Sequence, residues 1–278
     1  MSPPADAAPP VAPDLDAVKE RQQKTWASGD FSVVASRIVF QAEHLCEAAN
    51  LQAGWRVLDV ATGSGNAAIA AARRGCEVVG IDYVPALLER ARRRRDAEGL
   101  DAQFIEGDAE ALPYANGQFD VVSSVFGAMF APDQERTADE LTRVTRSGGR
   151  IGLASWTPEG FIGQYFKTNA KHVPPPAGVR SPLQWGTSER IGELFGDVAA
   201  EIRLERRFYA FRARSPQAWI EDFRRYYGPT LKSFEAVGEA GREALENDLL
   251  ELIAHFNRAV DGTMVVPSEY LEVVLVKA

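Results

Sequence analysis

The sequence has few of the residues that build metal centres and disulfide frameworks. Its 278 residues include two cysteines and three histidines, too few for a disulfide framework or a thiolate zinc site. We therefore expect free thiols in a reducing, cytoplasmic compartment, and no bound metal. No uncharged apolar run approaches the ~18 residues that span a bilayer, and the N-terminus carries an acid where a secretory signal has basic residues. Neither membrane insertion nor export is expected.

Cations are also in deficit. Lys and Arg total 31 against 39 Asp and Glu, which gives a net charge of −8. Proteins that bind nucleic acid draw much of their affinity from neutralising phosphates with cations, so this balance argues against a nucleic-acid partner. The four consecutive arginines at 92–95 are interpreted as the solvated face of a helix.

The order of predicted elements indicates one α/β domain. Residues 1–14 are rich in Pro and Ala and are predicted to be a disordered tail. Residues 15–278 are predicted to form a single domain, with an N-terminal helical cap at 15–54, a core at 55–156, and lid helices with C-terminal strands at 157–278. In the core, strands expected at 56–60, 77–81, 103–106, 119–125 and 150–156 alternate with helices expected at 66–74, 85–98 and 133–145. This alternation predicts a parallel sheet covered on both faces.

The final third is less regular. We expect helices near 161–171 and 189–195, and more helix from 215 to about 260. A strand pair or one long strand is predicted at 198–211, and a last strand at 270–276. A turn is predicted at 147–149, where the sequence reads Ser-Gly-Gly.

The densest chemical signal is the segment at 57–66, Val-Leu-Asp-Val-Ala-Thr-Gly-Ser-Gly-Asn. A strand that runs into glycines lets the backbone approach a ligand closely, and the amides of the following helix then face that ligand. Asp59 stands near the end of the first strand and Asp82 closes the second, where a carboxylate can accept hydrogen bonds from ribose hydroxyls. The loop also fits the dinucleotide pattern Gly-x-Gly-x-x-Gly/Ala. By itself it leaves open an NAD-dependent oxidoreductase.

Four further segments follow in order: Gly-Asp-Ala-Glu-Ala-Leu-Pro at 107–113, Gln-Phe-Asp-Val-Val-Ser-Ser at 118–124, Glu-Leu-Thr-Arg-Val at 140–144 and Ser-Gly-Gly-Arg at 147–150. With the glycine loop, they resemble the class I S-adenosylmethionine-dependent methyltransferases, in particular the ubiquinone/menaquinone C-methyltransferases. The likeness is specific over about 55–156. It implies a Rossmann-like, mostly parallel seven-stranded sheet with an antiparallel C-terminal strand and helical cap and lid insertions. It also implies S-adenosylmethionine as cofactor, S-adenosylhomocysteine as product, and no metal.

The resemblance carries over to a set of cofactor-binding positions, which are Asp59, Ala61, Thr62, Gly63, Gly65, Asp82, Tyr83, Asp108, Ala109, Ser124 and Val125. The first five would hold the amino-acid end of the cofactor. Asp82 would accept from the ribose hydroxyls, with Tyr83 beside the adenine. Asp108 would accept from the adenine amino group and Ala109 would supply a backbone contact. The last two would floor the site beneath the sulfonium. Ala61 stands where the family has its first glycine.

Aromatic residues are frequent in the cap and the lid: Trp26, Phe31, Trp156, Phe161, Tyr165, Phe166 and Trp185. Most are expected to pack helices onto the sheet. Such a lining also suits a small, partly apolar acceptor, such as a quinone precursor, a phenol or a secondary metabolite.

No catalytic residue is assigned from the sequence. A general base is needed only if the acceptor arrives protonated, and His172, Tyr226 and Tyr227 are the candidates. The other two histidines, His44 and His255, lie in helical patterns and are interpreted as surface or packing residues. A non-catalytic protein that binds S-adenosylmethionine stays an alternative. The sequence leaves open the acceptor, the atom methylated, and whether the chain is a monomer or a homodimer.

Overall fold

The structure is a computed structural model that describes residues 14–278. The tail predicted at 1–14 lies outside the described residues, except for Asp14. The carboxylate of Asp14 accepts a hydrogen bond from the amide of Ala17 and so caps the first helix, α1 (Leu15–Trp26).

The described residues form one seven-stranded sheet in the order β3-β2-β1-β4-β5-β7-β6. β7 is antiparallel to both of its neighbours, β5 and β6, and the remaining pairs are parallel. The predicted fold class is therefore confirmed. The strands are β1 (Arg56–Val60), β2 (Glu77–Asp82), β3 (Ala102–Glu106), β4 (Phe119–Val125), β5 (Thr145–Trp156), β6 (Ala199–Ala213) and β7 (Met264–Lys277).

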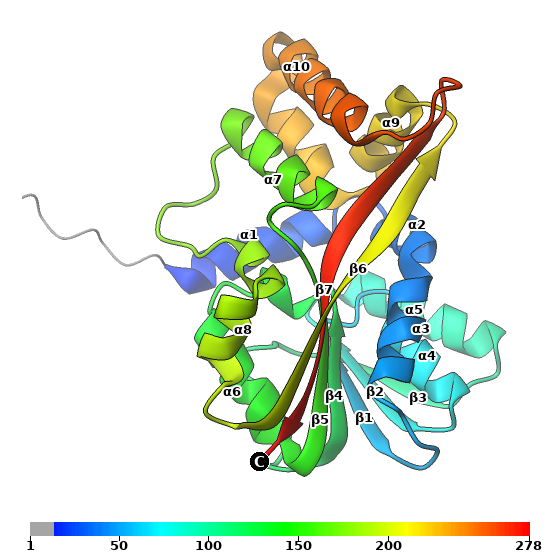
Figure 1. The fold of residues 1–278 in the computed structure, drawn as a ribbon, viewed down its shortest axis with the longest axis vertical. Helices are drawn as coiled ribbons and strands as arrows, with labels where there is room; N and C mark the ends of the chain where they lie inside the picture. Colours follow the sequence, from blue (N-terminus) through cyan, green and yellow to red (C-terminus); the bar gives the residue numbers. More distant parts are fainter. Residues whose placement is uncertain (1–13) are drawn as a thin grey trace, which may run out of the picture.

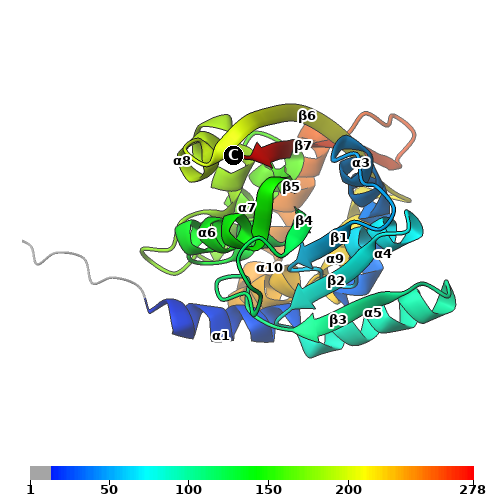
Figure 2. The same ribbon diagram turned by 90° about the horizontal axis from the view of Figure 1, so that it is seen from below.

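Helices cover both faces of this sheet (Figures 1 and 2). One face carries α3 (Val39–Ala48), α4 (Asn66–Arg73) and α5 (Pro85–Ala97), and the other carries α6 (Gln134–Val144) and α8 (Ser188–Phe195). Residues 67–71 of α4 are all buried, and four of them are alanine. Such small side chains let a helix backbone approach the sheet closely.

A second group of helices stands beyond the carboxyl ends of the parallel strands (Figure 1). It consists of α7 (Phe161–His172), α9 (Pro216–Tyr226) and α10 (Gly228–Phe256), with α1 lying across the strand ends. Short elements connect the groups: α2 (Phe31–Ala35), η1 (Ser36–Ile38), η2 (Ala128–Phe130) and η3 (Pro182–Gly186). β6 and β7 are long enough to reach from the sheet to α9 and α10.

Two of the expected strand features differ from the structure. The last strand begins at Met264, not at 270. The prediction was too short because Pro267 interrupts the apolar pattern in the sequence. A proline is tolerated there since β5 pairs only as far as Tyr270, so β7 has β6 alone as partner at that point. The turn expected at 147–149 is an irregularity inside β5, where the register against β4 shifts between Phe119 and Val121.

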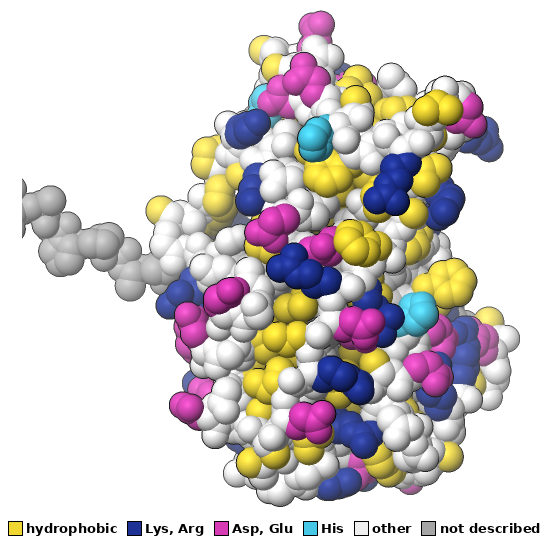
Figure 3. All heavy atoms as spheres, in the orientation of Figure 1, with side chains coloured by type: hydrophobic (Ala, Val, Ile, Leu, Met, Phe, Trp, Pro, Cys, Tyr) yellow, Lys and Arg dark blue, Asp and Glu magenta, His cyan; other side chains and the backbone are white. Residues whose placement is uncertain are grey.

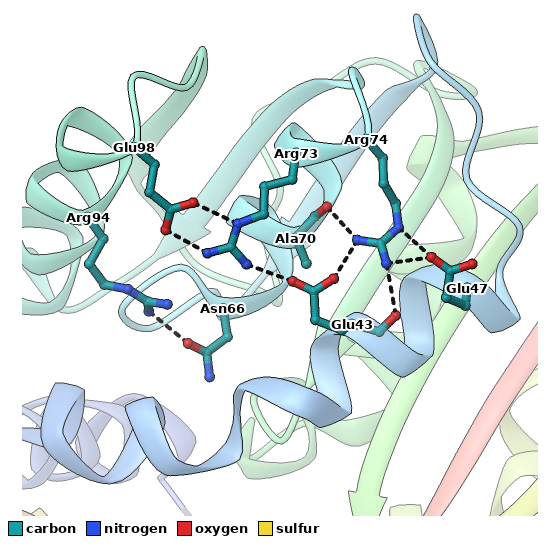
Figure 4. Close-up of polar contacts among 8 residues, drawn as sticks. All are labelled: Glu43, Glu47, Asn66, Ala70, Arg73, Arg74, Arg94 and Glu98. Carbon is teal, nitrogen blue, oxygen red and sulfur yellow. Dashed lines mark hydrogen bonds and ion pairs between the residues drawn. The ribbon is translucent and has the colours of Figure 1, made fainter.

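Ion pairs tie the three helices of one face together (Figure 4). Arg73 pairs with Glu43 of α3 and with Glu98 just after α5, and Arg74 pairs with Glu43 and Glu47. The nitrogen–oxygen distances are 2.6 to 2.7 Å. Exposed pairs contribute about 0–1 kcal/mol each, so this network fixes the positions of the helices more than it stabilises the fold.

On the face shown in Figure 3, Lys and Arg side chains are interspersed with Asp and Glu side chains. Over residues 14–278, no helix is both long enough and apolar enough to cross a membrane.

Candidate functional site

The glycine loop leaves β1 through a series of left-handed residues. Ala61 has φ 52°, Gly63 φ 55° and Gly65 φ 86°. A left-handed conformation costs an L-residue roughly 1–2 kcal/mol, so Ala61 holds a strained conformation at the position where the family has glycine. Loop strain of this kind persists only where the surrounding structure fixes it.

Asp59 holds this loop from behind. It accepts hydrogen bonds from Thr62 Oγ1 at 2.6 Å, from the Ala68 amide at 3.1 Å and from Ser123 Oγ at 3.0 Å. These contacts join β1 to the loop, to α4 and to β4. Burial raises the pKa of Asp59 to about 6.

Asp82 holds the loop from the neighbouring strand. Its two carboxylate oxygens accept from the amides of Gly63 and Val84, each at 2.8 Å. Burial raises the pKa of Asp82 to about 6, against the lowering effect of these amides. The two acids that the sequence singled out thus lie on adjacent strands and brace the same loop.

A first cavity opens to solvent at these strand ends, and its empty space together with its open mouth measures about 610 Å³. Six of the predicted cofactor positions lie on its wall: Ala61, Gly63, Asp82, Tyr83, Asp108 and Ala109. Its remaining wall is formed by Lys19, Trp26, Phe31, Val84, Leu87, Glu110, Phe126, Gly127, Ala128, Phe130, Ala131 and Pro132.

The structure does not bring the other five predicted positions onto this wall: Asp59, Thr62, Gly65, Ser124 and Val125. Ser124 Oγ donates to the Val60 carbonyl at 2.7 Å and accepts from the Ala128 amide at 2.8 Å, so it fixes the chain that follows β4. Gly65 is the N-cap residue just before α4, and a Cβ added to it would lie 3.1 Å from Phe104.

Sequence reasoning missed the contribution of α1 to the first cavity. Lys19 Nζ lies 2.7 Å from Asp108 and 2.6 Å from Glu110, and Gln23 donates to the Tyr83 carbonyl. Asp108 also accepts from the Glu110 amide at 2.9 Å. No local pattern in the sequence links Lys19 with partners about 90 positions away, so these contacts required the fold.

Gly127 was also missed. A Cβ at this position would collide with the carbonyl oxygen of Ala61, so only glycine allows the chain after β4 to pass the loop this closely. Phe126, the residue before it, has φ 54°. A second strained residue therefore lies on the wall of the same cavity.

The run of arginines at 92–95 is not simply a solvated face, and that expectation was wrong. Arg94 reaches the carbonyl of Ser64 and Oδ1 of Asn66, both at 2.7 Å (the Asn66 contact appears in Figure 4). Arg92 donates to the Phe104 carbonyl and Arg95 to the Ala102 carbonyl. The spacing of charges in the sequence does not show that carbonyls at strand ends and in the glycine loop lie within reach of these side chains.

A second cavity of about 380 Å³ adjoins the first. Its wall is entirely apolar or aromatic: Trp26, Phe31, Val34, Ile38, Phe126, Phe130, Trp156, Ile162, Phe166, Phe211, Phe223 and Tyr227. The rings of Phe126 and Trp156 stack with centroids 3.9 Å apart. Of the aromatic residues noted in the sequence, Phe161, Tyr165 and Trp185 are instead buried in the packing of the helices.

Of the three candidate bases, only Tyr227 lies on a cavity wall. His172 Nε2 is 2.9 Å from Asp248, a contact between α7 and α10. Tyr226 packs at the edge of the core, where Arg225 lies over its ring. Among residues 14–278 no group of three or more His, Cys, Asp or Glu side chains could hold a metal ion, and metal independence stays a prediction.

Comparison with known proteins decides the family. A protein of Mycobacterium tuberculosis, itself uncharacterised, is 37% identical over 247 residues, 87% of this chain and 89% of that one. A methyltransferase domain family matches residues 57–149. A demethylmenaquinone methyltransferase of Thermus thermophilus is 40% identical over 127 residues, 44% of this chain and 58% of its own. The chain belongs to the class I S-adenosylmethionine-dependent methyltransferases.

A solved structure agrees with this methyltransferase fold. The crystal structure of a putative methyltransferase from Bacillus halodurans superposes with a TM-score of 0.59 at 21% identity, and the match covers 85% of this chain and 97% of that one. Family membership also decides between the two interpretations of the glycine loop, because the cofactor of class I methyltransferases is S-adenosylmethionine and not NAD.

Proposed function

We propose that this methyltransferase transfers the methyl group of S-adenosylmethionine to a small, partly apolar acceptor, such as a quinone precursor, a phenol or a secondary metabolite. The observation that carries the proposal is the shared wall of the two cavities. Trp26, Phe31, Phe126 and Phe130 line both of them. A cofactor cavity with three carboxylates and one amine on its wall would thus meet an acceptor cavity that has no charged side chain.

The residues on the first cavity suit the cofactor. Asp82 is buried on this wall and would accept from the ribose hydroxyls, and Tyr83, the next residue on the wall, would lie beside the adenine. Asp108 and the backbone of Ala109 would contact the adenine. Gly127 lets the chain after β4 pass close to the Ala61 carbonyl, which holds this part of the wall against the glycine loop. Asp59, Thr62, Gly65, Ser124 and Val125 would act by holding this wall in place.

The bound cofactor would supply an activated methyl group on a sulfonium. The chain's own task is then to hold the acceptor in line and to keep water out, and orientation of this kind can lower a barrier by about 7–11 kcal/mol. The aromatic wall of the second cavity performs both tasks. The likeness to a demethylmenaquinone methyltransferase covers 44% of this chain, and it supports an acceptor with a flat ring.

Isothermal titration with S-adenosylmethionine and S-adenosylhomocysteine tests the cofactor half of the proposal. Absence of binding at high micromolar concentration would refute it. A screen that measures S-adenosylhomocysteine release with quinols, phenols and naphthols tests the transfer half, and reactions without acceptor provide the baseline. A cytoplasmic location also stays a prediction, based on the low cysteine content and on Cys46 and Cys76 being free thiols.

A further inference from the structure

Tyr227 is a buried tyrosine whose hydroxyl makes no hydrogen bond to any residue from 14 to 278. It joins α9 to α10, is 6% exposed and lines the second cavity. Two other tyrosines of the core have partners: the hydroxyl of Tyr165 bonds to Thr230, and that of Tyr209 to the Arg37 carbonyl. The Tyr227 hydroxyl has no such partner among residues 14–278. The hydroxyl is not among the unpartnered side-chain atoms that are sealed from solvent, so it borders open space, and a ligand in the second cavity would supply its partner.

The position of the Tyr227 ring is fixed by its neighbours. Its centroid lies 5.6 Å from that of Trp26, 6.0 Å from Phe31 and 5.3 Å from Phe223. Trp26 and Phe31 also line the first cavity. The tyrosine is thus held rigidly against the residues that separate the acceptor from the cofactor.

The other polar groups on the wall of the second cavity are also donors. Besides Tyr227, the side chains on this wall that carry a polar group are those of Trp26 and Trp156, whose indole N–H groups can only donate. The carboxylates and the amine nearest to this region, those of Asp82, Asp108 and Lys19, lie on the first cavity. A molecule in the second cavity therefore meets hydrogen-bond donors and aromatic faces, and no acid or base.

We propose that Tyr227 donates a hydrogen bond to an oxygen of the methyl acceptor, a ring carbonyl or hydroxyl, and so selects the acceptor atom that faces the methyl group. The inference rests on the proposed function, because it takes the second cavity as the acceptor's place. Burial raises the pKa of Tyr227 above its ordinary value, which keeps the phenol protonated at neutral pH. Its role is that of a donor, and the general base that the sequence allowed for is not needed at this position.

The test uses two matched probes on the full chain saturated with S-adenosylhomocysteine. 1-Tetralone is a bicyclic ketone whose oxygen only accepts hydrogen bonds, and tetralin has the same ring system without that oxygen. In the unmodified protein we expect the ketone to bind about 3–10-fold more tightly than the hydrocarbon, the usual net effect of one hydrogen bond. The carbonyl stretching band of the bound ketone should shift to lower frequency.

In Tyr227→Phe the two probes should bind equally, the carbonyl band should return to its position in an apolar solvent, and tetralin should bind as before. Tyr226→Phe, one residue earlier and outside both cavities, is the matched control and should behave as the unmodified protein does. Unchanged preference for the ketone in Tyr227→Phe would overturn the inference, as would failure of both probes to bind the loaded protein. Failure of S-adenosylhomocysteine itself to bind would instead refute the proposed function.

Discussion

The two cavities that meet at Trp26 and Phe31 are built in different ways. Apart from Lys19 and these two aromatic residues, the wall of the first cavity comes from residues 61–132, in the loops that follow β1 to β4. The wall of the second cavity draws on α2, η1, β5, α7, β6 and α9, which lie far apart in the sequence. The first cavity is formed by the ends of consecutive strands, and the second is formed by the packing of helices and strands that are distant in the sequence.

The two cavities also differ in how they can recognise a ligand. The first presents buried carboxylates and backbone groups at fixed positions, which suits one cofactor with defined hydroxyl and amino groups. The second presents ring faces and a few donors, so shape would determine most of its selectivity. Substitutions should therefore separate cofactor binding from methyl transfer.

The largest expected effect is the loss of transfer on filling the second cavity. Val34 lines only this cavity and is 5% exposed. In Val34→Phe the added ring would occupy the acceptor's space, and misplacement of an acceptor by about 1 Å can cost on the order of 100-fold in rate. We expect at least that loss in S-adenosylhomocysteine release, with cofactor affinity unchanged by titration calorimetry.

Val33→Phe is the matched control, since Val33 is the preceding residue of α2 and lies on neither cavity wall. It should retain transfer. Loss of cofactor affinity in Val34→Phe, with the melting temperature preserved, would show that the two cavities do not act separately.

The next effect concerns the first cavity alone. Asp82→Ala removes the carboxylate proposed to accept from the ribose hydroxyls and should weaken cofactor binding by about 1–3 kcal/mol, because partners are left unpaired. Asp120→Ala provides a comparison: Asp120 accepts from the Arg56 amide at 2.8 Å and from Arg146 at 2.7 Å, at the opposite ends of the strands. It should lower the melting temperature without changing the dissociation constant. Equal dissociation constants for both variants would contradict the placement of the ribose at Asp82.

The difference between the cavities also explains what the sequence could predict. Asp82 and the glycine loop lie at the ends of consecutive strands, and the alternation of strands and helices places such ends together. Val34 and Phe211 come to the wall of one cavity only through packing of α2 against the sheet and the lid, which no local pattern encodes. For the same reason Lys19 was missed, and the strand that begins at Met264 was predicted too short because Pro267 hides its first half.

A pH dependence should accompany cofactor binding. Asp82 has a pKa of about 6 in the free protein, and a carboxylate that accepts from hydroxyls binds best when ionised. Below pH 6 the carboxyl group of Asp82 is protonated and must lose its proton before the cofactor binds. The affinity for the cofactor should therefore fall about tenfold for each pH unit below 6. The stability of the free protein should change in the opposite sense. Because the folded-state pKa of Asp82 lies above the ordinary value of 3.8, its contribution to stability is present at low pH and is lost as the pH rises through 6.

Titration calorimetry from pH 5 to 7.5 would measure this slope, with Asp82→Asn as the variant that removes it. Asp59 also has a pKa of about 6 but lies behind the loop. A slope that survives in Asp82→Asn would assign the pH dependence to Asp59, and the first cavity would then respond to an acid that does not line it.

The smallest expected effect separates the cap from the rest of the first cavity. Lys19 is 25% exposed and pairs with Asp108 and Glu110, contacts that hold α1 over the cavity. Partly exposed pairs contribute about 0–1 kcal/mol, so Lys19→Met should speed the dissociation of S-adenosylhomocysteine by up to about fivefold and remove its dependence on salt. Lys24→Met, on an exposed residue at the end of α1, should leave the rate unchanged in stopped-flow displacement. If Lys19→Met slowed dissociation, Lys19 would be competing with the adenine for the carboxylate of Asp108. The helix α1 would then hinder cofactor binding, which is the opposite of the role that we expect.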